Sequence, residues 1–326
     1  MANKLRVYAA GGFGINVASE LSKFEGKESP GYADLNICYI DTSRSNLIGK
    51  KVKEESLYIL EGVDGSGKKR NQNYEVLAES AKDILHQHKP MDINIVLHSA
   101  SGGSGSVSAP ILVSELLKRG ELVIPVMVGS NASRIEVENT VKTLKSYEVI
   151  AMKNHKPVVA IYRENSKDTP RGMVDSDVTT LIILLAVLFS GQNRELDKAD
   201  LMNFINYHNV TDFQPKLNYL DFWSKTITLD KGCSLVSVAT ICDDENNPEL
   251  DIPVEYQAVG YIQEENKGVL SIKMPVHAGV VSGFFNQKVS ELEAKLHTFK
   301  EAREVVAMKS IGNIDVASAT DEGLIL

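Results

Sequence analysis

Cysteine is scarce in this sequence: the 326 residues include three, Cys38, Cys233 and Cys242, and none of them stands in a CxxC pair. A disulfide framework is therefore not expected, and a reducing compartment fits the composition. Long apolar runs are missing as well, because the longest, residues 181–189, is far shorter than a membrane span. We expect no membrane segment. No compact cluster of metal ligands is visible, so no protein metal site is predicted.

Positive charge is in deficit. Lys and Arg number 35 against 43 Asp and Glu, and the resulting net charge of −8 argues against broad nucleic-acid binding. The first residues, "MANKLRVYAAGGFG", start a strand almost at once and lack the form of a signal peptide. With 43% hydrophobic and 24% charged residues, the composition is that of an ordinary globular protein, which we expect in the cytoplasm.

Strand-like and helix-like segments alternate through the first two thirds of the chain, which predicts a doubly wound, Rossmann-like parallel sheet. Residues 175–190 are apolar nearly all round, so a buried core helix is expected there. Strand-like runs then indicate a smaller α+β domain, at 233–242, 254–263 and 268–274, before an amphipathic helix at 286–308. The predicted parts are a nucleotide-binding domain, a central core helix, a second domain, and a C-terminal helix with an acidic tail (1–174, 175–192, 193–285 and 286–326).

Three glycine-rich turns each stand between a strand and a helix, at 11–14, 62–67 and 102–105. In a parallel sheet such turns lie at the carboxyl edge, where ligands bind. Glycine lets backbone N–H groups approach an anion closely, and the helix that follows supplies partial positive charge. One such loop is as well explained as a plain turn, but three at one edge favour a phosphate site.

Two familiar phosphate motifs nearly match. "GFGINV" from Gly12 is similar to the dinucleotide fingerprint, with Asp41 placed to bind a ribose, but Val17 stands where a third small residue belongs. "GVDGSGKK" from Gly62 has the spacing of a P-loop, but Lys69 replaces the Ser or Thr that would hold Mg²⁺. Neither motif explains "SASGGSGSVSAP", residues 99–110, which has serines and no lysine.

Taken together, the loops resemble the tubulin/FtsZ family of GTP-dependent filament proteins. The GGGTGSG-like family signature stands here as "SGGSGSV", residues 101–107, with Ser104 in place of the usual Thr. The family's glycines followed by Asn stand as "GGFGIN" from Gly11, and its middle glycine loop as "DGSGKKRN". Its NxDxxD loop stands as "ELDKAD", with Glu195 in place of Asn. The resemblance covers nearly the whole chain and implies the tubulin fold.

The resemblance implies that GTP or GDP binds at the carboxyl edge, with Mg²⁺ held mainly by the nucleotide and water. Asn165 and Asp177 would face the guanine. Asp197 and Asp200 would reach the pocket of the next subunit and activate water, although their spacing alone is typical of a helix N-terminus. The cofactor-binding residues are expected to be Gly11, Gly12, Phe13, Gly14, Asn16, Asp41, Gly65, Ser66, Gly67, Ser101, Gly102, Gly103, Ser104, Gly105, Ser106, Asn165 and Asp177.

Within this family, the sequence is most similar to phage-encoded tubulins of the PhuZ type. The features that indicate this are degenerate loops, a small second domain and a long C-terminal helix with an acidic, apolar-tipped tail. This implies a GTPase that forms head-to-tail filaments, with the tail on a neighbouring subunit, and that positions phage DNA or the replication compartment in a bacterial host. A plasmid-segregating TubZ-like protein is the next interpretation. A Rossmann NAD(P)-dependent oxidoreductase and a non-catalytic nucleotide-binding scaffold remain alternatives.

Overall fold

A single sheet runs through the molecule in the computed structural model, which describes residues 2–26, 29–60, 74–243, 250 and 253–309, with the backbone alone at 74–78 and 303–309. Its eleven strands have the order β3-β2-β1-β4-β5-β6-β8-β11-β9-β10-β7. The first six strands in the chain are all parallel to their neighbours, as the alternating pattern predicts. They are β1 (Lys4–Ala10), β2 (Asp34–Asp41), β3 (Leu57–Ile59), β4 (Ile93–Ser99), β5 (Val123–Ser130) and β6 (Val158–Asn165).

The second half of the chain extends the same sheet, because β8 pairs with β6 in parallel register. β11 is antiparallel to both of its neighbours, β8 and β9. The prediction of a strand at 268–274 is wrong: these residues form a loop, and the Leu270 side chain lies where a Cβ on Gly31 would meet it. The strands of this half are β7 (Asn193–Arg194), β8 (Leu217–Trp223), β9 (Ser234–Cys242), β10 (Tyr256–Ile262) and β11 (Val276–Ser282).

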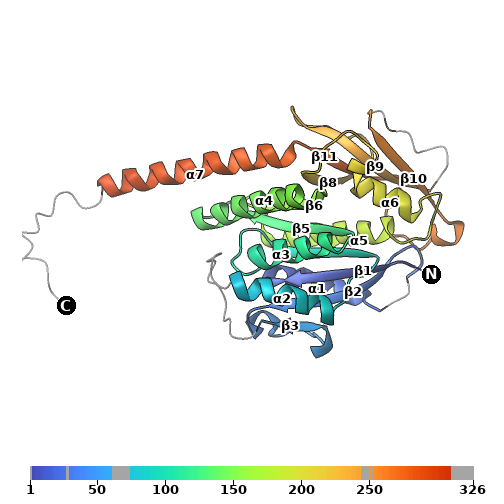
Figure 1. Cartoon of the computed structure of the whole chain (residues 1–326), viewed down its shortest axis with the longest axis horizontal. Coiled ribbons are helices and arrows are strands. Elements are labelled where there is room, and N and C mark those ends of the chain that lie inside the picture. The colour runs from blue at the N-terminus through green and yellow to red at the C-terminus, as the bar shows by residue number, and fades with distance from the viewer. Residues whose placement is uncertain (1, 27–28, 61–73, 244–249, 251–252, 310–326) are drawn as a thin grey trace, which may run out of the picture.

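Helices cover both faces of the sheet (Figure 1). Alternation along β1 shows the two layers: Leu5, Val7 and Ala9 belong to one buried cluster, while Tyr8 and Ala10 belong to the other. The first cluster is closed by α1 (Gly11–Leu21), α5 (Arg171–Leu188) and α6 (Lys198–Ile205). The second is closed by α2 (Tyr74–Gln87), α3 (Gly105–Lys118), α4 (Arg134–Asn154) and α7 (Phe284–Lys309).

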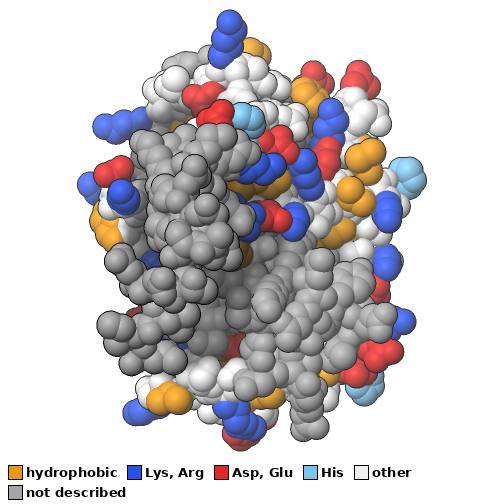
Figure 2. Space-filling view, turned by 90° about the vertical axis from the view of Figure 1, so that its left-hand side faces the viewer, with side chains coloured by type: hydrophobic (Ala, Val, Ile, Leu, Met, Phe, Trp, Pro, Cys, Tyr) orange, Lys and Arg blue, Asp and Glu red, His pale blue; other side chains and the backbone are white. Residues whose placement is uncertain are grey.

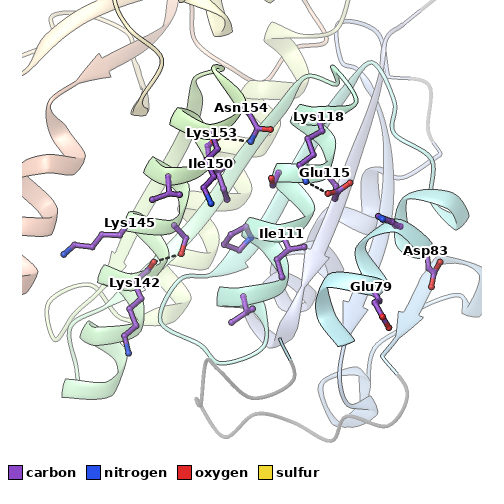
Figure 3. Close-up of a pocket in the computed structure, with 16 residues that line it drawn as sticks. Glu79, Asp83, Ile111, Glu115, Lys118, Lys142, Lys145, Ile150, Lys153 and Asn154 are labelled. Carbon is purple, nitrogen blue, oxygen red and sulfur yellow. Dashed lines mark hydrogen bonds and ion pairs between the residues drawn. The ribbon is translucent and has the colours of Figure 1, made fainter. Parts of the chain in front are cut away.

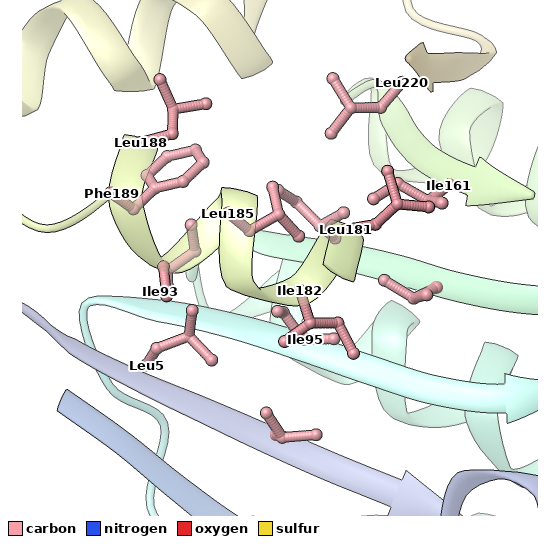
Figure 4. Close-up of a cluster of buried hydrophobic side chains, with 14 of the residues drawn as sticks. Leu5, Ile93, Ile95, Ile161, Leu181, Ile182, Leu185, Leu188, Phe189 and Leu220 are labelled. Atoms are coloured by element: carbon pink, nitrogen blue, oxygen red, sulfur yellow. The ribbon is translucent and has the colours of Figure 1, made fainter. Parts of the chain in front are cut away.

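Helix α5 is the buried core helix that the apolar run predicts. Ile182 and Leu185 are fully buried, and α5 packs over Leu5, Ile93 and Ile95 of the sheet (Figure 4). It follows β6 at the carboxyl edge, and beyond its end the Ser190 carbonyl accepts a hydrogen bond of 2.9 Å from the backbone N–H of Asn3, next to the start of β1. Helix α5 therefore runs from the carboxyl edge of the sheet to its amino edge, about 27 Å for its length.

Helix α7 confirms the predicted C-terminal helix and projects beyond the rest of the molecule (Figure 1). It packs on α4 through its first turns, where Phe285 and Leu292 are buried. In the coloured part of the end view, basic and acidic side chains are interspersed (Figure 2). Among the described helices, none combines the length and apolarity that a bilayer crossing requires.

Candidate nucleotide site

The last residues of β1, β2 and β4 surround a pocket of about 290 Å³ at the carboxyl edge of the sheet. The pocket brings together residues from the predicted set that lie far apart in sequence: Gly11, Gly12, Phe13, Asp41, Gly102, Gly103, Ser104 and Gly105. Thr42, Ser43, Ser45, Asn46 and Ser99 complete its polar wall. Gly14, Asn16, Ser101 and Ser106 lie beside it rather than in its lining, and Gly65, Ser66 and Gly67 lie outside the described residues.

Two helices begin at this pocket without a side-chain cap. Helix α1 starts at Gly11 directly after β1, and helix α3 starts at Gly105 after Ser104; neither Ala10 nor Ser104 caps its helix with a side-chain hydrogen bond. Helices α4 and α6, in contrast, are capped by the side chains of Ser133 and Asp197. Uncapped first-turn N–H groups need a partner, and an anion is a suitable one.

The glycines allow α1 and α3 to approach the strands closely. A Cβ on Gly14 would lie 2.6 Å from the backbone oxygen of Leu97, and a Cβ on Gly105 would lie 3.0 Å from that of Ala10. Gly11 has a φ of +72°, which a side chain would strain. Glycine is thus required here by backbone packing, and this packing sets the helix N-termini against the pocket.

Helix α4 holds the glycine loop from behind. The Asn139 amide donates hydrogen bonds to the carbonyl oxygens of Ser101 and Gly102 at 3.2 and 3.3 Å, and the Thr143 hydroxyl donates to that of Ala100 at 2.9 Å. Within the loop, the Ser106 hydroxyl donates to the Gly103 carbonyl at 2.9 Å. Asn139 and Thr143 were not predicted from the sequence; they belong to a row of buried polar residues on α4 that also includes Glu136 and Thr140.

Asp41 occupies the wall of the pocket at the end of β2 and is 5% exposed. Its carboxylate accepts hydrogen bonds from the Thr42 backbone N–H at 2.7 Å and from the Asn46 amide at 2.6 Å. Burial raises the pKa of the Asp41 carboxyl, and the hydrogen bonds from Asn46 and Thr42 act in the opposite direction. Asp41 thus orders the turn that carries Thr42 and Asn46, two pocket residues that were not predicted from the sequence.

The two residues predicted to face the base, Asn165 and Asp177, have different surroundings. Asn165 ends β6, and its Oδ1 is buried without a hydrogen-bond partner among the described residues. Asp177 instead pairs with Arg163 at 2.5 Å, on the side of α5 where Arg163 also bonds the Tyr219 hydroxyl of β8. Neither residue lines the pocket of Asp41, so their contact with a base stays a prediction.

Asn16, on α1, accepts a hydrogen bond from the Lys50 ammonium at 2.6 Å. Burial raises the pKa of the Asp175 carboxyl, two residues before Asp177, and the charges of Arg171 and Lys50 act in the opposite direction.

The "ELDKAD" segment lies at the opposite edge of the sheet, after α5. Asp197 and Asp200 form a capping box at the start of α6: Asp197 Oδ1 accepts from the N–H groups of Ala199 and Asp200, and Asp200 Oδ2 accepts from the Asp197 N–H. The Tyr256 hydroxyl donates to Asp200 Oδ1 at 3.2 Å. Among the described residues, Asp197 Oδ2 is the carboxylate oxygen of this pair without a hydrogen-bond partner.

This arrangement separates the two predicted halves of the site. The phosphate pocket and the paired carboxylates lie at opposite ends of α5, so within one chain they do not meet. Glu195, which stands where the family pattern has Asn, adopts a φ of +62°, a left-handed conformation that Asn adopts more readily than Glu. In the described part of the chain, no group of three or more His, Cys, Asp or Glu side chains is arranged to hold a metal ion.

The fold and the pocket define an α/β protein with a glycine-rich pocket at the carboxyl edge of its sheet, and comparisons with known proteins identify its relatives. No protein-family model matches the chain. The phage tubulin-like protein of Pseudomonas phage phiKZ is 31% identical over 221 residues, 64% of this chain and 64% of that protein. That of Pseudomonas phage PhiPA3 is 34% identical over 218 residues, 66% of this chain and 65% of that protein. The matched region thus spans just under two thirds of either relative.

The structural likeness extends further along the chain. A protofilament structure of TubZ from bacteriophage PhiKZ superposes with a TM-score of 0.81 and 26% identity, covering 93% of this chain and 92% of that one. The GDP-bound phage tubulin PhuZ has a TM-score of 0.83 at 20% identity, which is a likeness of fold, covering 99% of this chain and 100% of that one. The chain is thus similar to phage tubulins in sequence over about two thirds of its length and in fold over nearly all of it.

Proposed function

We propose that this chain binds GTP and GDP at the carboxyl-edge pocket, hydrolyses GTP, and assembles head to tail into tubulin-like filaments. One observation carries the proposal: two uncapped helix N-termini and a glycine loop meet at one edge of the sheet, while a pair of carboxylates is presented at the other. The protofilament of the 26% identical PhiKZ relative supports the assembly, and the GDP-bound phage tubulin of like fold supports the nucleotide.

In this proposal the phosphates lie against the first turns of α1 and α3, where backbone N–H groups of residues 11–14 and 102–106 bind them. The buried Oδ1 of Asn165 fits an N–H donor of the base, and Asn16 contacts the base or ribose from α1. The Thr42 and Ser104 hydroxyls and the Asp41 carboxylate are oxygen groups of the kind that Mg²⁺ accepts, so the wall fits that ion beside the phosphates. The ion would neutralise part of the phosphate charge.

Hydrolysis then requires two subunits. A second copy stacked along α5 would bring its amino edge, with Asp197 and Asp200, onto the nucleotide of the first. Asp197 Oδ2 is free to accept a proton from the attacking water, whereas both Asp200 oxygens are engaged within the chain, so Asp200 holds Asp197 in place. The contact is head to tail and does not close, so it produces filaments. Filament growth and hydrolysis are thereby coupled.

A second contact between subunits involves the C-terminal tail, residues 310–326, which lies outside the described residues. Its sequence combines Asp315, Asp321 and Glu322 with a final "LIL". A groove of about 1180 Å³ between α2, α3 and α4 offers a complementary surface, with an apolar floor that includes Ile111, Val149 and Ile150 (Figure 3). Its lining carries five lysines against three acidic residues, Glu79, Asp83 and Glu115; the lysines are Lys82, Lys118, Lys142, Lys145 and Lys153.

Helix α7, which precedes the tail in the chain, projects beyond the body of the molecule, and this favours a contact with a neighbouring subunit (Figure 1). Basic residues on α7 itself, Lys295, Lys300 and Arg303, are further candidate acceptors of the acidic tail. In a bacterial host the filament would position phage DNA or the replication compartment in the cytoplasm, and a plasmid-segregating role is the alternative.

Right-angle light scattering with GTP, GDP or ATP tests this function, together with phosphate release and NADH binding. We expect GTP to raise scattering and to be hydrolysed, GDP to support neither, and ATP and NADH not to bind. Binding of NADH without GTP would instead establish the oxidoreductase. GTP binding with neither scattering nor phosphate release would establish a nucleotide-binding scaffold.

A further inference from the structure

The charges on the two surfaces that would meet at the proposed subunit contact do not match if the two aspartates act alone. In the part of the phosphate pocket that the structure describes, the lining consists of backbone, hydroxyl and amide groups, Phe13 and one ionisable side chain, Asp41. A nucleoside triphosphate adds several negative charges there, and Mg²⁺ neutralises only two of them. Asp197 and Asp200 of the next subunit would add two more, so electrostatic repulsion would oppose the contact.

Lys198 lies between these two carboxylates in sequence and is the first residue of α6. Its side chain is 72% exposed, and its nearest acidic partner, Asp92, is 3.9 Å away. That separation is the outer limit of an ion pair, so the ammonium is lightly held. Lys4 of β1, Asp92 and Met202 lie with Lys198 on one surface at the amino edge of the sheet.

The position of Lys198 is also unfavourable for the helix itself. The N-terminus of a helix carries partial positive charge, which favours acidic residues in the first turn and disfavours a lysine. The capping box gives α6 its stabilising acid, Asp200, one turn on, and the 3.9 Å approach to Asp92 is the one contact of the Lys198 side chain among the described residues. A cation at this place is therefore better explained by a group outside the chain.

We propose that Lys198 of one subunit binds the terminal phosphates of the nucleotide held by the next subunit. This rests on the head-to-tail function proposed above and adds a residue to it. The ammonium relieves the repulsion between the aspartates and the phosphates. It also stabilises the charge that develops as the water oxygen bonds to the γ-phosphorus. The bond from that phosphorus to the bridging oxygen breaks, its electron pair leaves on GDP, and the water proton passes to Asp197 Oδ2.

The test compares Lys198→Ala and Lys198→Arg with the control Lys4→Ala. Lys4 lies on the same amino-edge surface as Lys198, but it does not stand between the two aspartates. Three quantities are measured for each variant: GTP affinity of the unassembled protein, filament mass, and phosphate release per assembled subunit. For Lys198→Ala we expect unchanged GTP affinity, because the lysine acts on the neighbour's nucleotide, and a fall in release of at least tenfold. Lys198→Arg should retain most of the release, and Lys4→Ala should stay within twofold of the unsubstituted chain.

If Lys198→Ala does not assemble alone, it is mixed in rising fraction with unsubstituted chain at constant total concentration. Release per assembled subunit should fall as the fraction rises, and a constant value would overturn the proposal. Wild-type release by assembled Lys198→Ala, or a loss of GTP affinity before assembly, would overturn it as well while leaving the filament function intact. Failure of the unsubstituted chain to hydrolyse GTP would instead reject the proposed function and this inference with it.

Discussion

The hydroxyls of Thr42 and Ser104 lie 3.2 Å apart, within hydrogen-bond distance, and join the turn after β2 to the start of α3. Both residues line the pocket, so this contact fixes the distance between two of its walls. Replacing Thr42 by Val keeps the shape and removes the hydroxyl.

We expect Thr42→Val to weaken GTP binding by about three- to tenfold, the range that corresponds to one net hydrogen bond. Titration with a fluorescent GTP analogue measures the affinity. Thr180→Val is a matched control, because the Thr180 hydroxyl bonds the Ser176 carbonyl within α5, away from the pocket. Equal GTP affinities for the unsubstituted chain, Thr42→Val and Thr180→Val would show that the Thr42–Ser104 contact does not shape the site.

The two aspartates of "ELDKAD" are best tested as asparagines, because Asn caps a helix almost as well as Asp and α6 then keeps its start. Asp197→Asn should lower phosphate release by about a hundredfold or more, the size of a lost general base, with GTP binding unchanged and filaments that do not turn over. Asp200→Asn should have the smaller effect, since its oxygens are engaged within the chain. Asp230→Asn, on an exposed loop, serves as the control. A larger effect at Asp200 than at Asp197 would reverse the assigned roles.

Much of this fold could be predicted from the sequence because its signals are local. Short apolar runs mark β1, β4 and β5, and the second half of α5, residues 181–188, is apolar because it packs against the sheet beside α1. The loop at 268–274 was misassigned because its apolar residues resemble a strand, although Leu270 packs beside Gly31. Pairing partners such as β6 and β8 are set by contacts distant in sequence, which periodicity does not reveal.

The candidate site likewise has residues that the sequence could predict and residues that it could not. The glycine loops could be predicted because the backbone is the expected ligand and glycine is visible in the sequence. Asn46 and Asn139 could not, since each reaches the site from a different element and polar residues of that kind occur throughout the chain. The family resemblance alone predicts that Asp177 faces the base, and its ion pair with Arg163 depends on how α5 is rotated against β6 and β8.

Two glycine-to-alanine substitutions distinguish the effect of close packing on stability from the effect of helix propensity. Gly14→Ala places a Cβ 2.6 Å from the Leu97 carbonyl oxygen, so the backbone must shift, and we expect a loss of about 1–3 kcal/mol in the free energy of unfolding. Gly172→Ala adds a methyl group to α5 where no atom lies within 4 Å, and should increase that free energy by about 0.5–1 kcal/mol. Urea denaturation without nucleotide measures both. Equal stability of the two variants would contradict the close packing of α1.

Asp41 predicts a pH dependence. Burial raises the pKa of its carboxyl in the folded chain, so ionising it at neutral pH lowers stability relative to an uncharged residue. Asp41→Asn, which can still cap the turn, should therefore be more stable than the unsubstituted chain at pH 7 in the absence of nucleotide. The difference should shrink as the pH falls through the raised value toward the ordinary aspartate range, about 4. Urea denaturation from pH 7 to 4 measures it, and a difference that grows on acidification would contradict the sign.

Deleting residues 314–326 should weaken assembly, because the acidic and apolar groups that would dock on a neighbour are lost. We expect the critical concentration for GTP-dependent light scattering to rise about tenfold, which corresponds to about 1.4 kcal/mol of contact free energy. GTP affinity of the unassembled protein should not change. Val149→Asp, at a groove residue that is 46% exposed, should weaken assembly in the full-length chain but add nothing to the deletion. Additive effects of the two changes would place the tail elsewhere, and normal scattering after the deletion would reject the tail contact.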